Sequence, residues 1–392
     1  MKLLRNWVKI ILLFLNKCIK KKEYISFCSI PDFSDNPQAL FDYIYHRYQC
    51  SNMKVCWHIM DKKNSKLVND WLKRDYNEKG MIVKVVPKYS VKSIYYFFRS
   101  RVIIDSHGMY EFKTNQQIDL YLFHGMPVKK VGYLLHTNLV PQKLIGFHYS
   151  VSSPLFKNIF MKAFYAEDND ISISGMPRND YLYKPISSYQ GISRYIVFMP
   201  TFRKTNGKYN FHMEDAKNTN NTLFNINQKD WSKIDLILKS RNIHMFIKPH
   251  PSDELHNVQY LSNCENIRLI DDKELLEQRI PLYRFLGGSM GLITDYSSTY
   301  IDYLLTNKPI CFFIPDLEEY KNNRGFVFDD FNEMLVGPVC RNTEDLCDYL
   351  KSDFPICDNY KRVKDLTNSI IGPISSSLIM KEFEQDIFLG RR

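Results

Sequence analysis

Five short clusters of polar residues have the side chains for chemistry, and each directly follows a segment that we expect to be a strand. In chain order they are HGMPVKK (124–130), GMPRND (175–180), PTFRK (200–204), KPHP (248–251) and DYSS (295–298). Ligands of open α/β sheets bind beyond the carboxyl ends of the strands. A single cluster carries little weight because loops collect polar residues anyway. Together the five predict one shared site.

Two histidines stand at restrained positions within these clusters. His124 follows an expected strand at 119–123 and precedes Gly125, whereas His250 lies between two prolines and two residues after Lys248. An imidazole titrates near neutral pH and can take a proton from an attacking hydroxyl, which contributes about 10² to 10⁴ in rate. We therefore interpret both as candidate catalytic residues, with a structural role in a loop as the alternative.

Ser297 and Ser298 follow the expected strand GLITD and open a helical segment. Serines at such a position cap a helix whatever the function. The functional interpretation adds a ligand, because the free N–H groups and the dipole of a helix N-terminus favour a diphosphate. Four cations are candidates to add positive charge to the same anion, although each alone is also typical of a solvated surface: Lys129, Arg178, Arg203 and Lys248.

The elements that must position these residues alternate between strands and helices. Short β-branched or aromatic runs such as YISFCSI and KVCWHIM alternate with longer amphipathic stretches, and the second half repeats the pattern with YIVFMP, HMFIKP, GLITD and PICFFI. This alternation is typical of a parallel sheet covered by helices. Two such halves fit a chain of 392 residues, since one domain usually has about 100 to 200 residues.

A stretch rich in Ser, Pro and Gly at 183–194 indicates the boundary between the halves. An Asn-rich stretch at 204–230 has no periodicity and is interpreted as a loop. We predict an α/β protein in four parts: a helix at 1–22, a first domain at 23–185, a second domain at 190–365 and a helical tail at 366–392.

The positive charge is concentrated at the N-terminus. Of the net charge of +10, seven cations and no acids fall within residues 1–22, so the rest of the chain carries +3 (10 minus 7). A nucleic-acid-binding domain would carry a basic face over its body, so we expect no nucleic-acid partner.

Residues 1–22 are expected to form an amphipathic helix that lies on an anionic membrane surface. Their uninterrupted apolar run covers only residues 10–15, whereas a spanning helix needs about 20 apolar residues. Anionic headgroups would attract the trailing Lys20, Lys21 and Lys22. A helix packed on the protein's own body and a signal peptide are the alternatives. On a helical projection the polar residues form one stripe: Lys2, Arg5, Lys9, Asn16 and Lys20.

Neither a metal site nor a cofactor site stands out. The nine cysteines include no CxxC pair and no nearby histidine at zinc-ligand spacing, which is typical of reduced thiols in a cytosol. The closest approach to a DxD pattern is Asp168 and Asp170, which we interpret as a solvated loop. We expect a reaction that uses no metal and no cofactor.

Taken in order, these strings resemble the CDP-glycerol glycerophosphotransferase family of teichoic-acid primases and polymerases. FHGMPVKKVG (123–132) is similar to the family's WHGTPLKTLG, SGMPRND (174–180) to G-Y-P-R-N-D, and MPTFR (199–203) to A-P-T-W-R. The longest match is residues 293–329, which resembles the family's TDYSS, FDY, KRP, FF, DLEEY and RGFYFD in sequence. The resemblance covers roughly residues 90–350.

The resemblance implies a GT-B fold, in which two Rossmann-like domains flank an active cleft and the C-terminal helix returns to the first, acceptor-side domain. It implies that His124 and His250 are essential, and that Ser297 and Ser298 bind the donor diphosphate in the second domain. Thr201 and Arg203 sit in a matching motif and are expected to bind the same diphosphate. Other residues lie in or beside the motifs and are further donor-site candidates: Gly125, Lys129, Arg178, Lys248, Asp295, Glu319 and Arg324.

The expected reaction follows from this resemblance. Glycerol phosphate, or a related polyol phosphate, would pass from CDP-glycerol or CDP-ribitol to a hydroxyl of a lipid-linked or growing surface polymer, such as teichoic acid or capsule, with release of CMP. The enzyme would act peripherally at the cytoplasmic face of a bacterial membrane. Phe123, Met126 and Phe202 depart from the usual motif residues and leave the polyol open. A nucleotide-sugar glycosyltransferase of the same fold and an inactive membrane-bound scaffold are the alternatives.

Overall fold

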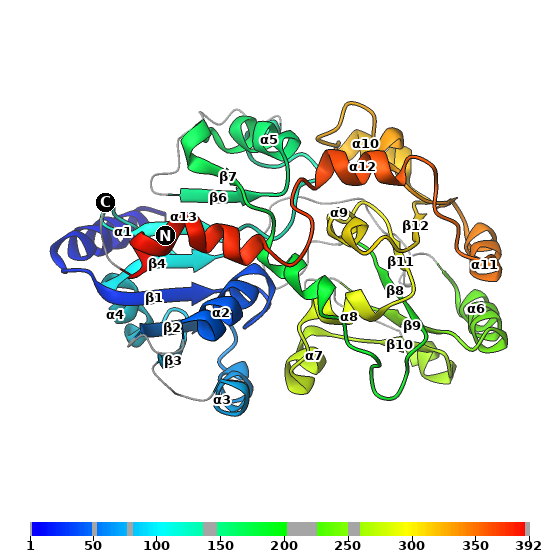
Figure 1. Ribbon diagram of the computed structural model, residues 1–392, viewed down its shortest axis with the longest axis horizontal. Helices are drawn as coiled ribbons and strands as arrows, with labels where there is room; N and C mark the ends of the chain where they lie inside the picture. The colour runs from blue at the N-terminus through cyan, green and yellow to red at the C-terminus, as the bar shows by residue number, and fades with distance from the viewer. Residues whose placement is uncertain are drawn as a thin grey trace.

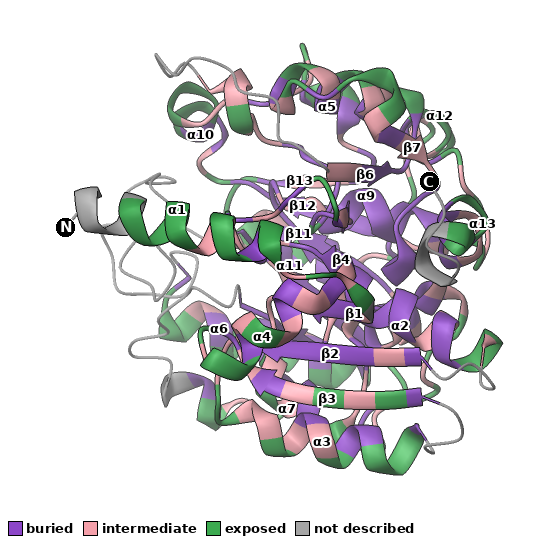
Figure 2. Ribbon diagram, turned by 90° about the vertical axis from the view of Figure 1, so that its left-hand side faces the viewer, coloured by how far each residue is buried: buried purple, intermediate pink, exposed green. Residues whose placement is uncertain are grey.

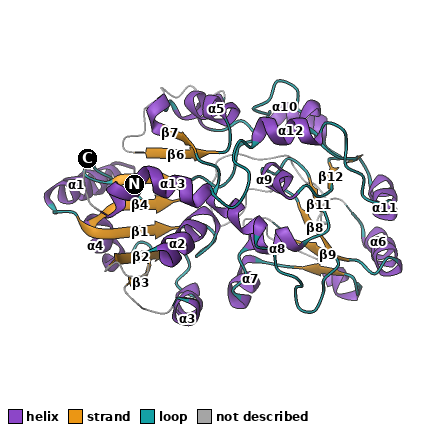
Figure 3. Ribbon diagram, viewed as in Figure 1, coloured by secondary structure: helices purple, strands orange, loops and turns teal. Residues whose placement is uncertain are grey.

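The computed structural model describes residues 2–48, 53–76, 81–135, 147–201, 226–249 and 259–388. Within these ranges the chain forms two sheets, each made of parallel strands, that lie side by side with helices packed on them (Figures 1 and 3). The α/β class and the two-sheet organisation predicted from strand and helix alternation are confirmed.

The first sheet has the described strand order β3-β2-β1-β4-β5-β6-β7, and every neighbouring pair is parallel. The order reverses between β1 and β4, and ligands of such sheets bind at this kind of switch point. The strands are β1 Lys22–Cys28, β2 Met53–Ile59, β3 Met81–Pro87, β4 Ser100–Asp105, β5 Ile118–Tyr121, β6 Phe147–Val151 and β7 Ile171–Ile173.

The second sheet has the described order β10-β9-β8-β11-β12-β13 and is also parallel throughout. Its order reverses between β8 and β11, where the clusters at 200–204 and 295–298 begin. The strands are β8 Tyr195–Met199, β9 His244–Ile247, β10 Ile267–Leu269, β11 Leu292–Thr294, β12 Ile310–Phe313 and β13 Val339–Cys340.

Several helices begin at side chains that accept a backbone N–H bond, namely those of Ser90, Asn227, Asp271 and Asn342, as expected for N-caps. The α-helices are α1 Lys2–Cys18, α2 Asp35–Arg47, α3 Asn64–Asp75, α4 Val91–Arg99, α5 Pro154–Phe164, α6 Gln228–Ser240, α7 Asp272–Gln278, α8 Leu282–Gly288, α9 Thr299–Tyr303, α10 Leu317–Asn323, α11 Thr343–Lys351, α12 Tyr360–Thr367 and α13 Ser375–Phe388.

Three local expectations need correction. The strand expected at 119–123 ends at Tyr121, because Phe123 has a left-handed φ of 55°. The helix expected after Ser298 is only Thr299–Tyr303, followed by a 3₁₀ turn. Of the loop expected at 204–230, residues 204–225 lie outside the described ranges and 228–230 form the first turn of α6.

The two sheets share one hydrophobic core, which includes Tyr149 and Val151 from the first and Val197 and Phe312 from the second. The chain then returns to the first sheet through α13, which lies across it in Figure 1. Ile379, Met380 and Phe383 of α13 belong to the same apolar cluster as the strand residues Ile25, Val55 and Leu120. The sheets are thus joined by packing as well as by the chain.

Helix α1 packs on the first domain through residues of its second half. Leu12 and Leu13 contact the apolar cluster beneath α4, and buried Asn16 donates to the Phe112 carbonyl and to Gln117 Oε1, at 2.8 Å each. Lys21 Nζ donates to Asn16 Oδ1 at 2.6 Å. The expectation of a solvated polar stripe is therefore wrong for Asn16, and Lys21 is directed towards the protein.

The solvent-facing side of α1 carries many large apolar side chains. Its large exposed side chains are Trp7, Val8, Ile10, Ile11, Phe14 and Leu15, and the helix extends from the body of the molecule in Figure 2. Among the described residues, no helix has the length and apolar character needed to cross a membrane.

Candidate active site

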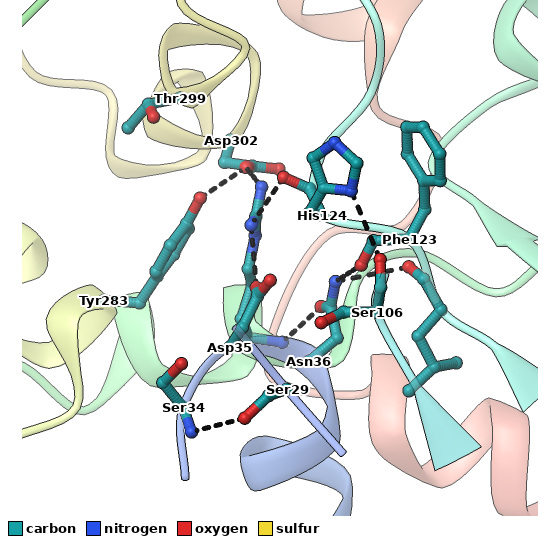
Figure 4. A network of polar contacts seen from close by, with 12 residues as sticks. Ser29, Ser34, Asp35, Asn36, Ser106, Phe123, His124, Tyr283, Thr299 and Asp302 are labelled. Atoms are coloured by element: carbon teal, nitrogen blue, oxygen red, sulfur yellow. Dashed lines mark hydrogen bonds and ion pairs between the residues drawn. The ribbon is translucent and has the colours of Figure 1, made fainter. Parts of the chain in front are cut away.

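The turn after β5 carries His124 and is held in an unusual conformation. Phe123 has a φ of 55° and Gly125 a φ of 131°. The side-chain amide of buried Asn36, near the start of α2, donates to the carbonyls of Leu122 and Phe123 at 3.3 and 2.9 Å (Figure 4). These bonds hold the two carbonyls that follow β5 and fix the direction in which His124 leaves the sheet.

One nitrogen of His124 has a defined role. Nδ1 lies 3.2 Å from the carbonyl oxygen of Ser106, and because a carbonyl only accepts, Nδ1 carries the proton and Nε2 keeps its lone pair. His124 keeps part of its surface exposed to solvent, although protein atoms lie close around the ring and displace water from it. This desolvation lowers the pKa of the imidazole, and Arg178 and Lys129 lower it further, whereas the Ser106 bond and Asp35 raise it.

The loop of the second domain that contains Ser298 lies directly against the His124 turn. A Cβ atom at Gly125 would lie 2.5 Å from Ser298 Oγ and 2.7 Å from Arg178 Nη2. Only a glycine leaves room for this approach, and its φ also favours glycine. The structure therefore brings together two clusters that are 173 residues apart (298 minus 125).

The loop that carries His124 makes a second contact with the other domain a few residues further along the chain. Lys129 pairs with Phe326 in an antiparallel bridge, and the N–H of Val327 donates to the Val128 carbonyl at 3.0 Å. The Lys129 ammonium lies 5.5 Å from the centre of the Tyr320 ring. Arg324 is half-buried beside this bridge, so the HGMPVKK and RGF motifs form one surface.

Arg178 lies between the domains as a buried cation. Its guanidinium contacts Asp35 Oδ1 at 2.7 Å and Asp302 Oδ2 at 2.6 Å, and it donates to the His124 carbonyl at 3.0 Å. Tyr283 Oη also donates to Asp302 at 2.6 Å. Desolvation opposes the charge of Arg178, but the two carboxylates hold its pKa well above the usual value. The sequence left open that Arg178 is a solvated surface residue. In the structure it is buried between two carboxylate partners instead.

The strand-end loops of the second sheet are joined by Asp295. Its carboxylate accepts from the Thr201 N–H at 2.8 and 2.9 Å and from Thr201 Oγ1 at 2.9 Å. Ser297 Oγ lies 3.1 Å from Thr299 Oγ1, and Ser298 makes no side-chain cap bond to α9. Thr201 and Asp295 therefore hold in place the loop that presents the two serines.

The remaining candidates are dispersed. Lys248 is buried and forms an ion pair with Asp272 at 2.9 Å, and Glu319 is exposed on α10. Arg203 and His250 lie outside the described residues. Asp168 forms an ion pair with Lys157 at 2.8 Å before the first residue of β7. Asp168 therefore lies at the amino ends of the parallel strands, whereas His124 lies at their carboxyl ends.

Comparison with known proteins decides the family. The profile of the CDP-glycerol:poly(glycerophosphate) glycerophosphotransferase family matches residues 10–370. The chain belongs to this family. The resemblance predicted from its motifs, and its class as a transferase, are confirmed.

Relatives of this glycerophosphotransferase act in teichoic acid synthesis. It is 26% identical over 371 residues to the teichoic acid poly(glycerol phosphate) polymerase of Bacillus spizizenii strain W23, covering 86% of this chain and 83% of the relative. It is 28% identical over 305 residues to the teichoic acid glycerol-phosphate primase of Bacillus subtilis strain 168, covering 71% of each. The structure of the wall teichoic acid polymerase TagF is similar at a TM-score of 0.70 and 20% identity, covering 98% of this chain and 94% of that chain.

Sequence prediction did not single out several residues of this glycerophosphotransferase that contact its motifs, among them Asn36, Asp302 and His107. Asn36 bonds the carbonyls of the His124 turn, and no spacing pattern in the sequence points to it. Asp302 bonds Arg178 and lies in the IDY segment that resembles the family's FDY, so this motif could have pointed to it. His107 stacks on His124. It follows strand β4 within two residues, so the criterion of polar residues after strands would have found it.

Proposed function

We propose that this enzyme transfers glycerol phosphate, or a related polyol phosphate, from a CDP-linked donor to a hydroxyl of a lipid-linked or growing surface polymer, with release of CMP. The observation that carries the proposal is the contact between the His124–Gly125 turn of the first domain and Ser298 of the second. A base and a hydroxyl-rich donor loop then face one reaction centre. The names of the relatives favour teichoic acid as the polymer class.

His124 acts as the general base in this proposal. Its Nε2 lone pair takes the proton of the acceptor hydroxyl, and the acceptor oxygen forms a bond to the β-phosphorus. The bond between that phosphorus and the bridging oxygen breaks, and CMP leaves with the electron pair. Since the Ser106 carbonyl holds the Nδ1 proton, the ring is already in the tautomer that accepts at Nε2.

The donor diphosphate binds in this proposal between the Ser297–Ser298 loop and the loop after β8. The hydroxyl groups of the two serines donate to its oxygens, with Arg203 and His250 expected to add positive charge. Lys129 is the cation on the base's own loop. No step requires a metal, so we predict that EDTA leaves the rate unchanged.

We further propose that α1 attaches the enzyme to the cytoplasmic face of the membrane. The exposed apolar side of α1 enters the interface, and the exposed cations Lys17 and Lys20 at its end meet anionic headgroups. The polar contacts of Asn16 and Lys21 hold the helix to the body, so that its apolar side faces outward.

Vesicle flotation tests the attachment. Phe14→Glu should release the protein from vesicles that contain anionic lipid, because Phe14 is 65% exposed on α1. Leu236→Glu is the matched control, since Leu236 is 67% exposed on α6 and should leave binding unchanged. Equal binding of wild type and Phe14→Glu would refute the attachment through α1.

The reaction is tested by following CMP release and the fate of phosphorus. Purified enzyme is given CDP-glycerol, CDP-ribitol or CMP-sialic acid with a lipid-linked acceptor mimic. We expect CMP from a CDP-polyol and phosphate in the acceptor, with a loss of about 10² to 10⁴ in His124→Ala. His244→Ala, at the start of β9, is the control. Release from CMP-sialic acid alone would establish a sugar transferase, and release from no donor would favour a scaffold.

A further inference from the structure

A second histidine lies face to face with the proposed base. His107 follows β4, the strand beside β5 in the first sheet. Its ring centre is 4.3 Å from that of His124, and the two ring planes differ by 15°. Phe123 also stacks on His124, with ring centres 4.2 Å apart. The imidazole of His124 is therefore oriented by stacking as well as by its hydrogen bond.

One residue holds both imidazoles. The carbonyl of Ser106 accepts the Nδ1 proton of His124, and the hydroxyl of Ser106 lies 2.9 Å from Nδ1 of His107. The loop is closed by Asp105, whose Oδ1 accepts from the Gly108 N–H at 3.0 Å. A movement of His107 would therefore be transmitted to the atom that fixes the tautomer of His124.

Two imidazoles this close cannot both carry a positive charge at low cost, so their protonation is coupled. The other charged groups that act on His124 are Asp35 from the start of α2, Arg178 from the 3₁₀ turn after β7, and Lys129 from the loop itself. Asp35 and Arg178 form an ion pair at 2.7 Å. An imidazole ordinarily titrates near neutral pH, so the protonation of His107 bears on that of His124.

We propose that His107 is a positioning residue for His124: its ring fixes the plane of the base, and its charge disfavours a second proton on the pair. This inference rests on the proposed role of His124 as base. It adds a residue of the first domain to the reaction, without requiring that His107 touch either substrate.

Two substitutions separate the stacking from the charge. His107→Phe keeps a flat ring but cannot be protonated, so kcat at its pH plateau should stay within about threefold of wild type. Loss of the neighbouring charge should move the acidic limb of kcat/KM up by about 0.5 to 1 pH unit. His107→Ala removes the ring, and a misplaced base should lower kcat by about 10- to 100-fold with KM little changed.

A readout that does not depend on turnover is the NMR titration of the His124 ring, whose pKa should rise in His107→Phe. In a His124→Gln background, His107→Ala should have no further effect on the residual rate, because it acts through His124. An unchanged His124 titration in His107→Phe, or an undiminished effect of His107→Ala in that background, would overturn the inference. If His124→Gln itself keeps full activity, the proposed function fails instead.

Discussion

The turn after β5 and the turn after β11 both lie at the carboxyl end of a parallel strand, one in each sheet, but they are built differently. The first has left-handed backbone at Phe123 and Gly125 and takes its support from Asn36, in a helix of the same domain. The second is held by Asp295, which bonds the neighbouring loop through Thr201. Left-handed backbone at a bulky residue is sparsely populated and persists only where surrounding contacts enforce it.

This difference matches the proposed tasks of the two turns. A base must present one nitrogen at a defined angle, and a strained turn that several contacts hold in place can do so. A diphosphate has many acceptor oxygens, so a loop that presents hydroxyl groups tolerates more variation in angle. Arg178 connects the two, since it bonds the His124 carbonyl on one side and Asp302 of α9 on the other.

The largest effect is expected from removing that connection. Arg178→Met leaves Asp35 and Asp302 buried without their cation, which should lower the free energy of unfolding by about 3 to 5 kcal/mol. Urea unfolding at pH 7.5 measures this loss. Lys239→Met removes one partner of the exposed pair with Glu265 and should change stability little. Equal stability of the two variants would show that Arg178 does not hold the domains together.

The next effect tests the approach of the two turns. Gly125→Ala should lower kcat/KM by about 10²-fold, because the new Cβ would meet Ser298 Oγ at 2.5 Å. Gly191→Ala is the matched control: Gly191 also has a left-handed φ, of 83°, but nothing lies within 4 Å of its added Cβ. Gly191→Ala should cost some stability and keep full activity. Full activity of Gly125→Ala would refute the contact.

The sequence predicted most of the fold because the two sheets are parallel and buried, so their strands appear as short apolar runs between amphipathic stretches. It also predicted where several site residues lie, because strand ends in such sheets share an edge. The conformation of Phe123 was not predictable, since nothing local favours a left-handed phenylalanine. The two carboxylate partners of Arg178 were not predictable either. Asp35 and Asp302 are 267 positions apart in the sequence (302 minus 35), and only the fold brings them together.

A smaller effect is expected from removing side-chain hydrogen bonds that hold each turn in place. Asn36→Ala leaves the carbonyls of Leu122 and Phe123 without their donor, which should cost about 1 to 3 kcal/mol and lower kcat because the base turn relaxes. Thr201→Val removes one hydroxyl bond to Asp295 and keeps the two bonds of its backbone N–H. It should cost about 1 kcal/mol, with a smaller loss of kcat than in Asn36→Ala. A larger loss of kcat in Thr201→Val would reverse the assignment of strain to the first turn.

The smallest effect concerns pH and follows from the surroundings of His124. Only the neutral imidazole accepts a proton, and it predominates above its pKa. Desolvation, together with Arg178 and Lys129, lowers that pKa, so the acidic limb of kcat/KM should lie below the ordinary histidine value of about 6.5. Lys129→Gln removes one of the cations that lower the pKa and should therefore move the limb upward. A limb above 6.5 in the wild type would mean that the base is stabilised in its charged form, contrary to the geometry of the turn.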